Sequence, residues 1–154
     1  MQIPSWLAIA GVAIAIFGLV NRQSAADRRW FFRLKRPRWL SFEPIIPVIW
    51  TVILICGVWS AYLVWEASQN AGLMGLYALL EVLIMGYNSG MGKMRSLWVG
   101  VWIGAAGFLV GVVTALGVAP VSGAALGLLM PYLIWSPVGT FVTWKMIHLN
   151  PEDA

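Results

Sequence analysis

The chain has 154 residues, which suits a single domain. Hydrophobic residues make up 60% of it and charged residues only 10%, against about 25% charged residues in soluble domains. A water-soluble fold of this size could not bury so much apolar surface, so the composition excludes a soluble protein and indicates that lipid is the solvent. Backbone groups in lipid must hydrogen-bond within the protein, and long apolar runs without period-two alternation therefore predict helices.

Five apolar runs follow one another along the chain, each near the roughly 20 residues that cross a bilayer. We expect transmembrane helices over residues 4–20, 44–65, 71–90, 97–118 and 121–147, within a single domain of residues 1–154. The first run does not read as a cleaved signal peptide, because its positive charges follow the apolar core instead of preceding it. Near the C-terminus, Gly117, Pro120 and Gly123 predict the turn between the last two helices.

The ten lysines and arginines are confined to alternate connections of this map. Seven of them lie in the loop of residues 21–43, Lys93 and Arg95 follow the third helix, and Lys145 lies near the end of the fifth. With five spans all ten lie on one side, and positive charge marks the cytoplasmic side. The sequence therefore predicts an all-α bundle of five transmembrane helices with its N-terminus outside and its C-terminus in the cytoplasm. The net charge of +4 reflects basic residues that set the orientation of the helices and contact anionic lipid, and no nucleic-acid partner is expected.

The loop of residues 21–43 is the one long connection in the map. It is rich in aromatic side chains, among them Trp30, Phe31, Phe32, Trp39 and Phe42. A disordered linker would not carry so many of them. We expect this loop to fold back on the cytoplasmic end of the bundle as a lid. A segment that lies flat in the membrane interface is the alternative.

The catalytic inventory of the chain is small. There is one histidine, His148, and one cysteine, Cys56, so neither a metal site nor a disulfide is expected. No catalytic residue and no required cofactor follow from the residue types. Glycines four residues apart, such as Gly100 and Gly104, allow helices to approach closely, either within one molecule or in a homodimer.

Tryptophan is the unusual feature, with ten in the chain. Trp50 and Trp135 lie inside predicted spans instead of at their ends, where interfacial tryptophans gather. Each shares a helical face with small or apolar residues, namely Pro47, Leu54, Gly57 and Ala61 in the second helix and Tyr132, Gly139 and Val142 in the fifth. Two large rings beside small residues indicate a cavity that stacks a flat ligand, and ordinary core packing is the alternative.

Glu81 is the one ionisable residue deep within a predicted span. A charge there costs about 2.5 kcal/mol or more, so the side chain should face the protein interior or be protonated. It is a candidate ligand or proton site. The alternative is a neutral carboxyl group that hydrogen-bonds a neighbouring helix.

Two stretches of the sequence resemble a known family. Residues 30–39 read W-F-F-R-L-K-R-P-R-W, and residues 131–140 read P-Y-L-I-W-S-P-V-G-T, with Leu149 and Asn150 following. This pattern resembles the TspO family, also called the translocator protein, peripheral benzodiazepine receptor or tryptophan-rich sensory protein family. The resemblance runs from Trp30 to Asn150.

The resemblance implies a five-helix bundle, often a homodimer, in a membrane that we expect to be the bacterial inner membrane. It also implies a ligand such as a porphyrin or a sterol-like molecule, in a cavity closed by the loop. Trp50 and Trp135 correspond to tryptophans thought to act in light-dependent porphyrin breakdown in some bacterial members. Gly139 corresponds to a small residue beside the cavity, and Trp39 to the lid motif.

We therefore expect a tetrapyrrole-binding membrane protein. Porphyrin degradation with Trp50 and Trp135 as electron donors is one alternative, and a transporter or signalling scaffold that uses Glu81 is another. The expected ligand contacts are Trp39, Pro47, Trp50, Leu54, Glu81, Tyr132, Trp135, Gly139 and Val142.

The chain also departs from the family pattern. Ser41 and Phe42 occupy the places of two prolines. Glu81, Met85 and Asn88 stand where the third helix usually carries glutamine, asparagine and tryptophan. The shape of the cavity should be kept while its polar lining is changed, so the ligand could differ from the family's usual one.

Overall fold

The computed structural model describes residues 3–154, and within them it contains helices and no strands. The α-helices are α1 (Ser5–Val20), α2 (Ala25–Arg33), α3 (Ile46–Ser68), α4 (Ala71–Met94), α5 (Leu97–Val118) and α6 (Gly123–Leu149). Two short 3₁₀ helices cover Glu43–Ile45 and Pro151–Asp153. The predicted all-helical fold is confirmed.

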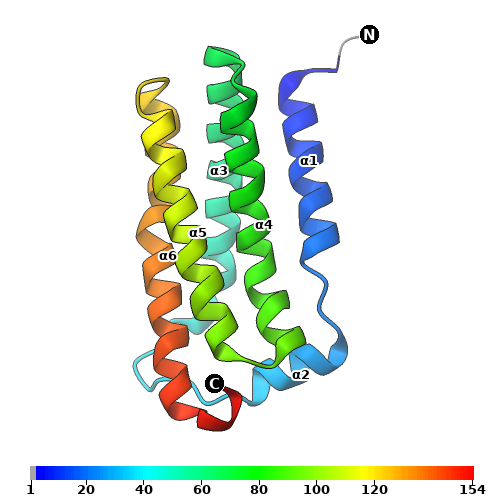
Figure 1. Cartoon of the computed structure of the whole chain (residues 1–154), viewed down its shortest axis with the longest axis vertical. Helices are drawn as coiled ribbons and strands as arrows, with labels where there is room; N and C mark the ends of the chain where they lie inside the picture. The colour runs from blue at the N-terminus through cyan, green and yellow to red at the C-terminus, as the bar shows by residue number, and fades with distance from the viewer. Residues whose placement is uncertain (1–2) are drawn as a thin grey trace.

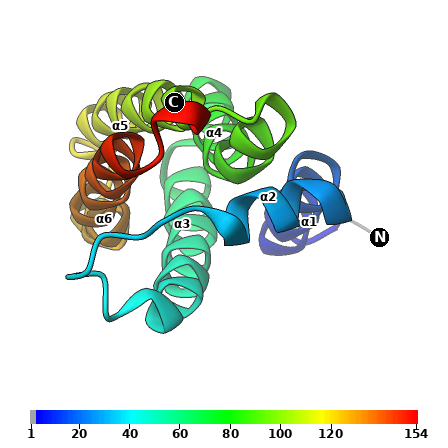
Figure 2. The ribbon, with the colours of Figure 1, turned by 90° about the horizontal axis from the view of Figure 1, so that it is seen from below.

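Five of the helices run along the long axis, and α2 lies across the end of the bundle that holds the C-terminus (Figure 1). Helix α5 packs against both α4 and α6, and α6 also packs against α3. Helix α1 stands beside α3 and α4 at the edge of the bundle, as the view along the axis shows (Figure 2). The elements that carry the ten lysines and arginines meet at the α2 end.

Four helices, α3 to α6, are long and apolar enough to cross a membrane. Helix α1 has 16 residues, or about 24 Å at 1.5 Å per residue, and passes the same test only together with α2. The two are bent by 79° relative to each other. The structure thus contains four candidate spans, or five if α1 and α2 count as one. The long helices follow the predicted ranges, with α4 continuing past residue 90 to Met94 and α6 beginning at Gly123 instead of 121.

Helix α2 is an element that the hydropathy pattern did not predict. Its signal is a capping box, in which Asp27 N–H donates to the Ser24 hydroxyl (3.1 Å) and Ser24 N–H donates to the Asp27 carboxylate (2.9 Å). The backbone hydrogen bond from Ser24, followed by its hydroxyl, lowers the pKa of Asp27 below its ordinary value. Because α2 is short and polar on one face, apolar runs alone could not reveal it.

The rest of the loop packs against the end of the bundle. Trp30 is 2% exposed, and with Leu34 and Leu40 it joins a core that includes Met91 and Val142. The Trp30 indole N–H donates to Asp153 (2.7 Å). The loop therefore lies against the helix ends instead of extending away from them.

Asn150 ties the loop to the end of α6. Its amide group donates to the Lys35 carbonyl (3.0 Å) and the Met146 carbonyl (2.9 Å), while its oxygen accepts from Lys35 N–H (2.8 Å). This buried side chain satisfies both backbone groups of Lys35, which gives a physical role to the asparagine of the L-N pair.

Replacing Asn150 by leucine should release the loop. The variant leaves Lys35 N–H and C=O without partners, which costs about 1–3 kcal/mol. We expect faster tryptic cleavage after the exposed Arg38, measured on the purified protein. Asn88→Leu, at an exposed position of α4, is the matched control. Equal cleavage rates in the two variants would contradict this role for Asn150.

Candidate ligand cavity

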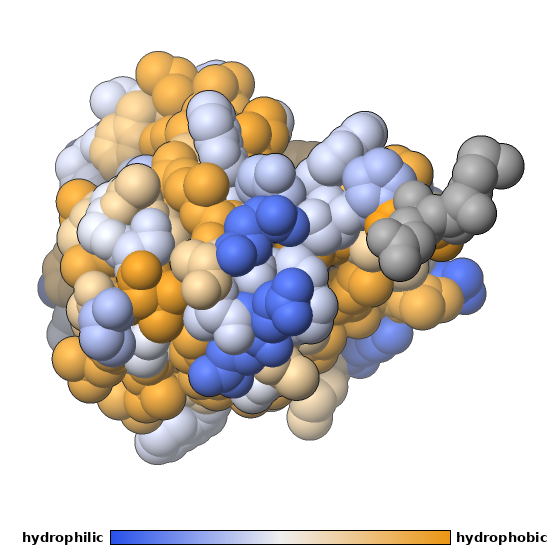
Figure 3. Space-filling view, turned by 90° about the horizontal axis from the view of Figure 1, so that it is seen from above, coloured by the Kyte–Doolittle hydropathy of each residue, from blue (hydrophilic) through white to orange (hydrophobic). Residues whose placement is uncertain are grey.

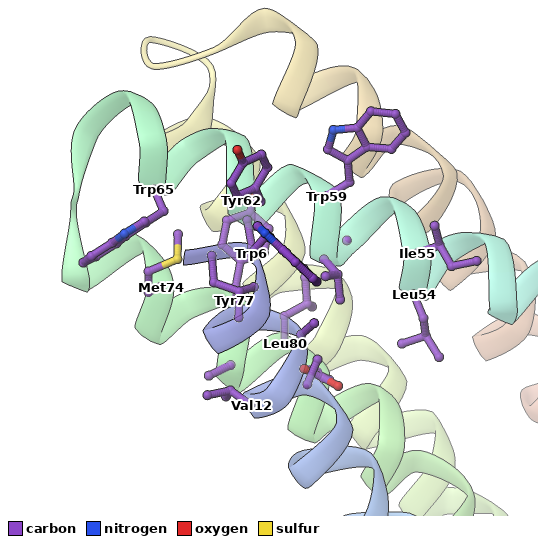
Figure 4. A pocket seen from close by; sticks show the side chains of 18 of the residues that line it. Trp6, Val12, Leu54, Ile55, Trp59, Tyr62, Trp65, Met74, Tyr77 and Leu80 are labelled. Atoms are coloured by element: carbon purple, nitrogen blue, oxygen red, sulfur yellow. The ribbon is translucent and has the colours of Figure 1, made fainter. Parts of the chain in front are cut away.

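A cavity of about 940 Å³ lies among α1, α3 and α4, with α6 contributing part of its wall. Its tryptophan and tyrosine residues come from all four helices, and Figure 4 shows Trp6, Tyr62 and Tyr77 together at one end of it. The full set of these aromatic residues is Trp6, Trp59, Tyr62, Trp65, Tyr77 and Tyr132. The cavity extends from the end of the bundle near Ser5 along most of α1, as far as Phe17, and reaches Ile53 of α3 and Ile84 of α4.

The cavity exists because small side chains face one another where α1 meets its neighbours. Ala10 and Ala13 of α1 lie in its wall, and so do Gly57 and Ala61 of α3. None of residues 5–20 of α1 is buried, so this helix does not close tightly on the bundle. A Cβ atom built on Gly57 would meet nothing within 4 Å. Side chains this small cannot fill the space between helices, and a void remains.

Most of the wall is apolar, and its buried polar groups are largely satisfied by the protein. The Ser60 hydroxyl behind the wall donates to the Ala125 carbonyl (2.7 Å). Its one proton is used there, so the Tyr77 hydroxyl donates to Ser60 (2.5 Å). At the end of the cavity near the start of α1, the Ser5 hydroxyl donates to the carboxylate of Glu66.

Glu81 is different from these groups. Its half-buried side chain lies in the wall, and no hydrogen bond or ion pair joins it to any other residue in the range 3–154. No lysine or arginine among those residues lines the cavity. Glu81 is therefore an acceptor of hydrogen bonds that faces an apolar, aromatic space without a donor from the protein.

The predicted ligand contacts are divided between this cavity and its surroundings. Leu54, Glu81 and Tyr132 line it. Trp50 and Gly139, again with Tyr132, line a second gap of about 20 Å³, which is room for about one water molecule. The remaining four residues line neither space in the described part of the chain, namely Trp39, Pro47, Trp135 and Val142.

Trp50 and Trp135 nevertheless stand close to the cavity. Both pack against a cluster of Ile53, Leu80 and Tyr132, and these three side chains are part of the cavity wall. The two tryptophans thus lie one side-chain layer behind the space that a ligand could fill.

The expectation that the loop of residues 21–43 closes the ligand cavity is not met, because none of these residues lines the cavity wall and the loop packs on the other end of the bundle. The loop instead reaches Trp135 through Phe42. Their rings meet edge to face with centroids 6.3 Å apart, and Phe42 is 6.4 Å from Trp39. Trp39 itself packs against Phe141 of α6 (6.2 Å). Val142 belongs to the core beneath the lid, and Pro47 is exposed. Trp39 therefore contacts Trp135 indirectly, through Phe42, and does not line the cavity wall.

The contribution of α1 was missed from the sequence. Trp6 reads as an interfacial residue because it stands at the end of a span, but its ring lies in the cavity wall. The available signal was the repeated alanines and glycines along this helix, among them Ala10 and Ala13. Among the residues in the described range, no group of three or more histidine, cysteine or acidic side chains could hold a metal ion.

A comparison with known families matches residues 6–149 to the TspO/MBR family. The chain is 28% identical over 153 residues to the tryptophan-rich protein TspO of Chlorobaculum tepidum, with 92% of each chain covered. It is 24% identical over 148 residues to the uncharacterized membrane protein YtaB of Bacillus subtilis, which covers 94% of this chain and 95% of that one. The matched region includes the loop of residues 21–43 and all of the long helices except Ser5, the first residue of α1.

Proposed function

This chain belongs to the TspO/MBR family, as its motifs predict, and we propose that it is a receptor for a flat, largely apolar ligand of the porphyrin type. The observation that carries the proposal is the aromatic cavity of about 940 Å³ inside an integral, multi-pass membrane protein. Ligand sites in proteins measure about 300–1,000 Å³ and bury most of the ligand against apolar and aromatic walls. A flat conjugated ring, or the similar body of a sterol, suits such walls.

The proposed orientation has five spans, with the N-terminus outside and the lid and C-terminus in the cytoplasm of a bacterial inner membrane. It is supported by the position of all ten lysines and arginines at the α2 end of the bundle. A homodimer is part of the proposal. Gly123 and Gly127, four residues apart, are exposed with open space around them and offer one surface for close packing of a second copy.

Light-dependent degradation of the bound porphyrin is the second candidate function. The observation in its favour is the position of Trp50 and Trp135, which back the wall formed by Ile53, Leu80 and Tyr132. An excited ligand in the cavity would lie within one side-chain layer of both indole rings. The proposal assigns them the role of electron donors and leaves binding to the cavity wall.

Titration of the purified protein with protoporphyrin, followed by tryptophan fluorescence, tests the binding proposal. We expect saturable quenching in the dark, with a smaller quenched fraction in Trp6→Phe, because Trp6 lines the cavity. Trp102→Phe is the matched control, since this α5 residue is 69% exposed and does not line the cavity. Quenching that is linear in ligand, or equally affected by both substitutions, would refute binding at this site.

The same sample under illumination tests degradation. New absorption bands that appear in the wild type and slow down in Trp50→Phe and Trp135→Phe would support electron donation. An unchanged porphyrin spectrum under light, with quenching intact, leaves the receptor function alone.

A further inference from the structure

We propose that Glu81 makes the cavity selective for flat amphiphiles that carry a protonated amine. This inference rests on the proposed function, because it concerns the ligand class of the same cavity. It begins with the distribution of charge along the bundle.

The acidic residues fall into two groups. Four lie at the α2 end among the lysines and arginines, where Glu43 pairs with Arg36 (3.0 Å) and Asp153 pairs with Arg33 (2.7 Å). The other two are Glu81, in the first half of α4, and Glu66, near the end of α3. All ten basic residues belong to the opposite end, so the half of the bundle that contains the cavity has two carboxyl groups and no basic side chain.

The surface at the end of the bundle nearest the cavity also lacks lysine and arginine side chains. The end of α3 exposes Glu66, and the turn that follows exposes Gln69 and Asn70. Seen from this end, the surface has a small hydrophilic patch among residues of intermediate and apolar character (Figure 3). A cation that approaches here meets acceptors and a carboxylate without repulsion from lysine or arginine.

Glu81 offers such a cation a partner. Its carboxyl group lines the cavity, and within residues 3–154 no donor hydrogen-bonds to it. A carboxyl group without a partner at this depth in a membrane is costly. A ligand that brings a donor offsets that cost, and a protonated amine brings both a charge of opposite sign and several N–H donors.

The aromatic wall favours the same chemistry. Trp6, Tyr62 and Tyr77 lie in the wall together with Glu81, and the faces of such rings attract ammonium groups. A carboxylate with several aromatic rings is the combination that recognises organic cations. A carboxylate-bearing ligand could bind only with its acidic groups turned away from Glu81.

The position of the cavity opening determines how apolar the rest of the ligand must be. Val12 and Ile14 of α1, and Ile55 and Trp59 of α3, line the cavity and are also exposed on the outside of the bundle. The cavity is therefore open between α1 and α3, on a surface that faces lipid. A molecule that enters there must dissolve in the bilayer, which excludes small hydrophilic amines and favours amphiphiles.

Three pyrene probes with one flat body and different head groups test the selectivity: pyrenemethylamine, pyrenemethanol and pyrenecarboxylate. Energy transfer from protein tryptophan to pyrene reports binding to the full-length protein in detergent. We expect the amine to bind about tenfold more tightly than the alcohol, and the carboxylate to bind most weakly. In Glu81→Gln the amine and the alcohol should bind equally within about threefold, and the carboxylate should gain affinity.

Two further variants make the outcome specific. Glu81→Asp keeps the charge and should retain the amine preference, while Glu152→Gln removes an exposed carboxylate at the opposite, α2 end of the bundle and should leave the preference unchanged. Amine preference that persists in Glu81→Gln, or a wild type that binds amine and alcohol equally, overturns the inference while cavity binding stands. If no probe binds saturably, the inference falls together with the proposed cavity.

Discussion

Replacing Gly57 by phenylalanine should strongly weaken ligand binding and leave the bundle folded. Gly57 lies in the cavity wall, and a Cβ atom there meets nothing within 4 Å, so a phenyl ring can extend into the open space without displacing α1 or α4. Removing a helical glycine also favours α3 slightly, by about 0.5 kcal/mol. The ring would occupy volume that a flat ligand needs, and we expect the dissociation constant to rise by on the order of a hundredfold.

The matched control is Gly75→Phe. Gly75 also has nothing within 4 Å of an added Cβ, but it lies on α4 outside the cavity wall. The measurement is the quenching titration with protoporphyrin, together with the unfolding midpoint of each variant. Unchanged affinity in Gly57→Phe would place the ligand elsewhere, and the layer of Trp50 and Trp135 would then be the next site to test.

The helices could be predicted from the sequence because lipid imposes simple conditions on each of them separately. A span must be apolar over about 20 residues, and its basic neighbours must lie on one side. Residues 44–65 and 97–118 meet these conditions without reference to any other part of the chain, and α3 and α5 follow them closely. Helix α2 was not predicted because the capping pair Ser24 and Asp27 and the burial of Trp30 stabilise it, not a long apolar run.

The candidate site was predicted less completely than the helices. A cavity forms where small residues on facing helices leave space unfilled, and the sequence does not show which helices face each other. The period of the helix placed Trp50 with Leu54, and Tyr132 with Trp135, on common faces, and all four lie in or behind the cavity wall. The periodicity could not predict which other helix each face would pack against. Ala13 and Gly57 create space only because α1 stands opposite α3, and that pairing comes from the packing of the whole bundle.

Glu81 illustrates the same distinction. Its depth in a span predicted that the side chain faces the protein interior or is protonated, and the side chain lines the cavity among α1, α3 and α4. Whether it would meet a donor depended on the residues of α1, α3 and α6 that surround it, which the sequence alone did not place. An interhelical hydrogen bond was the alternative, and the structure contains none to Glu81 within residues 3–154.

Replacing Gly104 by leucine should destabilise the protein more than any other substitution considered. Gly104 lies on α5 where this helix meets α4 and α6. A Cβ atom there would collide with the Thr140 side chain and come within 3.2 Å of the Tyr87 ring. Tyr87 is itself hydrogen-bonded to the Thr143 hydroxyl and donates to the Gly139 carbonyl (3.3 Å), so its ring cannot move without breaking this contact between α4 and α6. The Thr140 hydroxyl donates to the Ser136 carbonyl within α6 (2.9 Å). We expect a loss of at least about 3 kcal/mol, measured by sodium dodecyl sulfate titration in mixed micelles.

The origin of this loss can be isolated with smaller changes. Gly104→Ala introduces only the Cβ atom, and Thr140→Ala removes the hydroxyl that it meets, so the double variant should recover part of the stability lost in Gly104→Ala. Gly75→Leu, with open space around its Cβ, controls for adding a bulky apolar side chain to a span. If Gly104→Leu unfolds at the same midpoint as Gly75→Leu, close packing of α5 against α4 and α6 does not hold the bundle together. In that case the small residues of α5 would need another explanation, such as contact with a second copy of the chain.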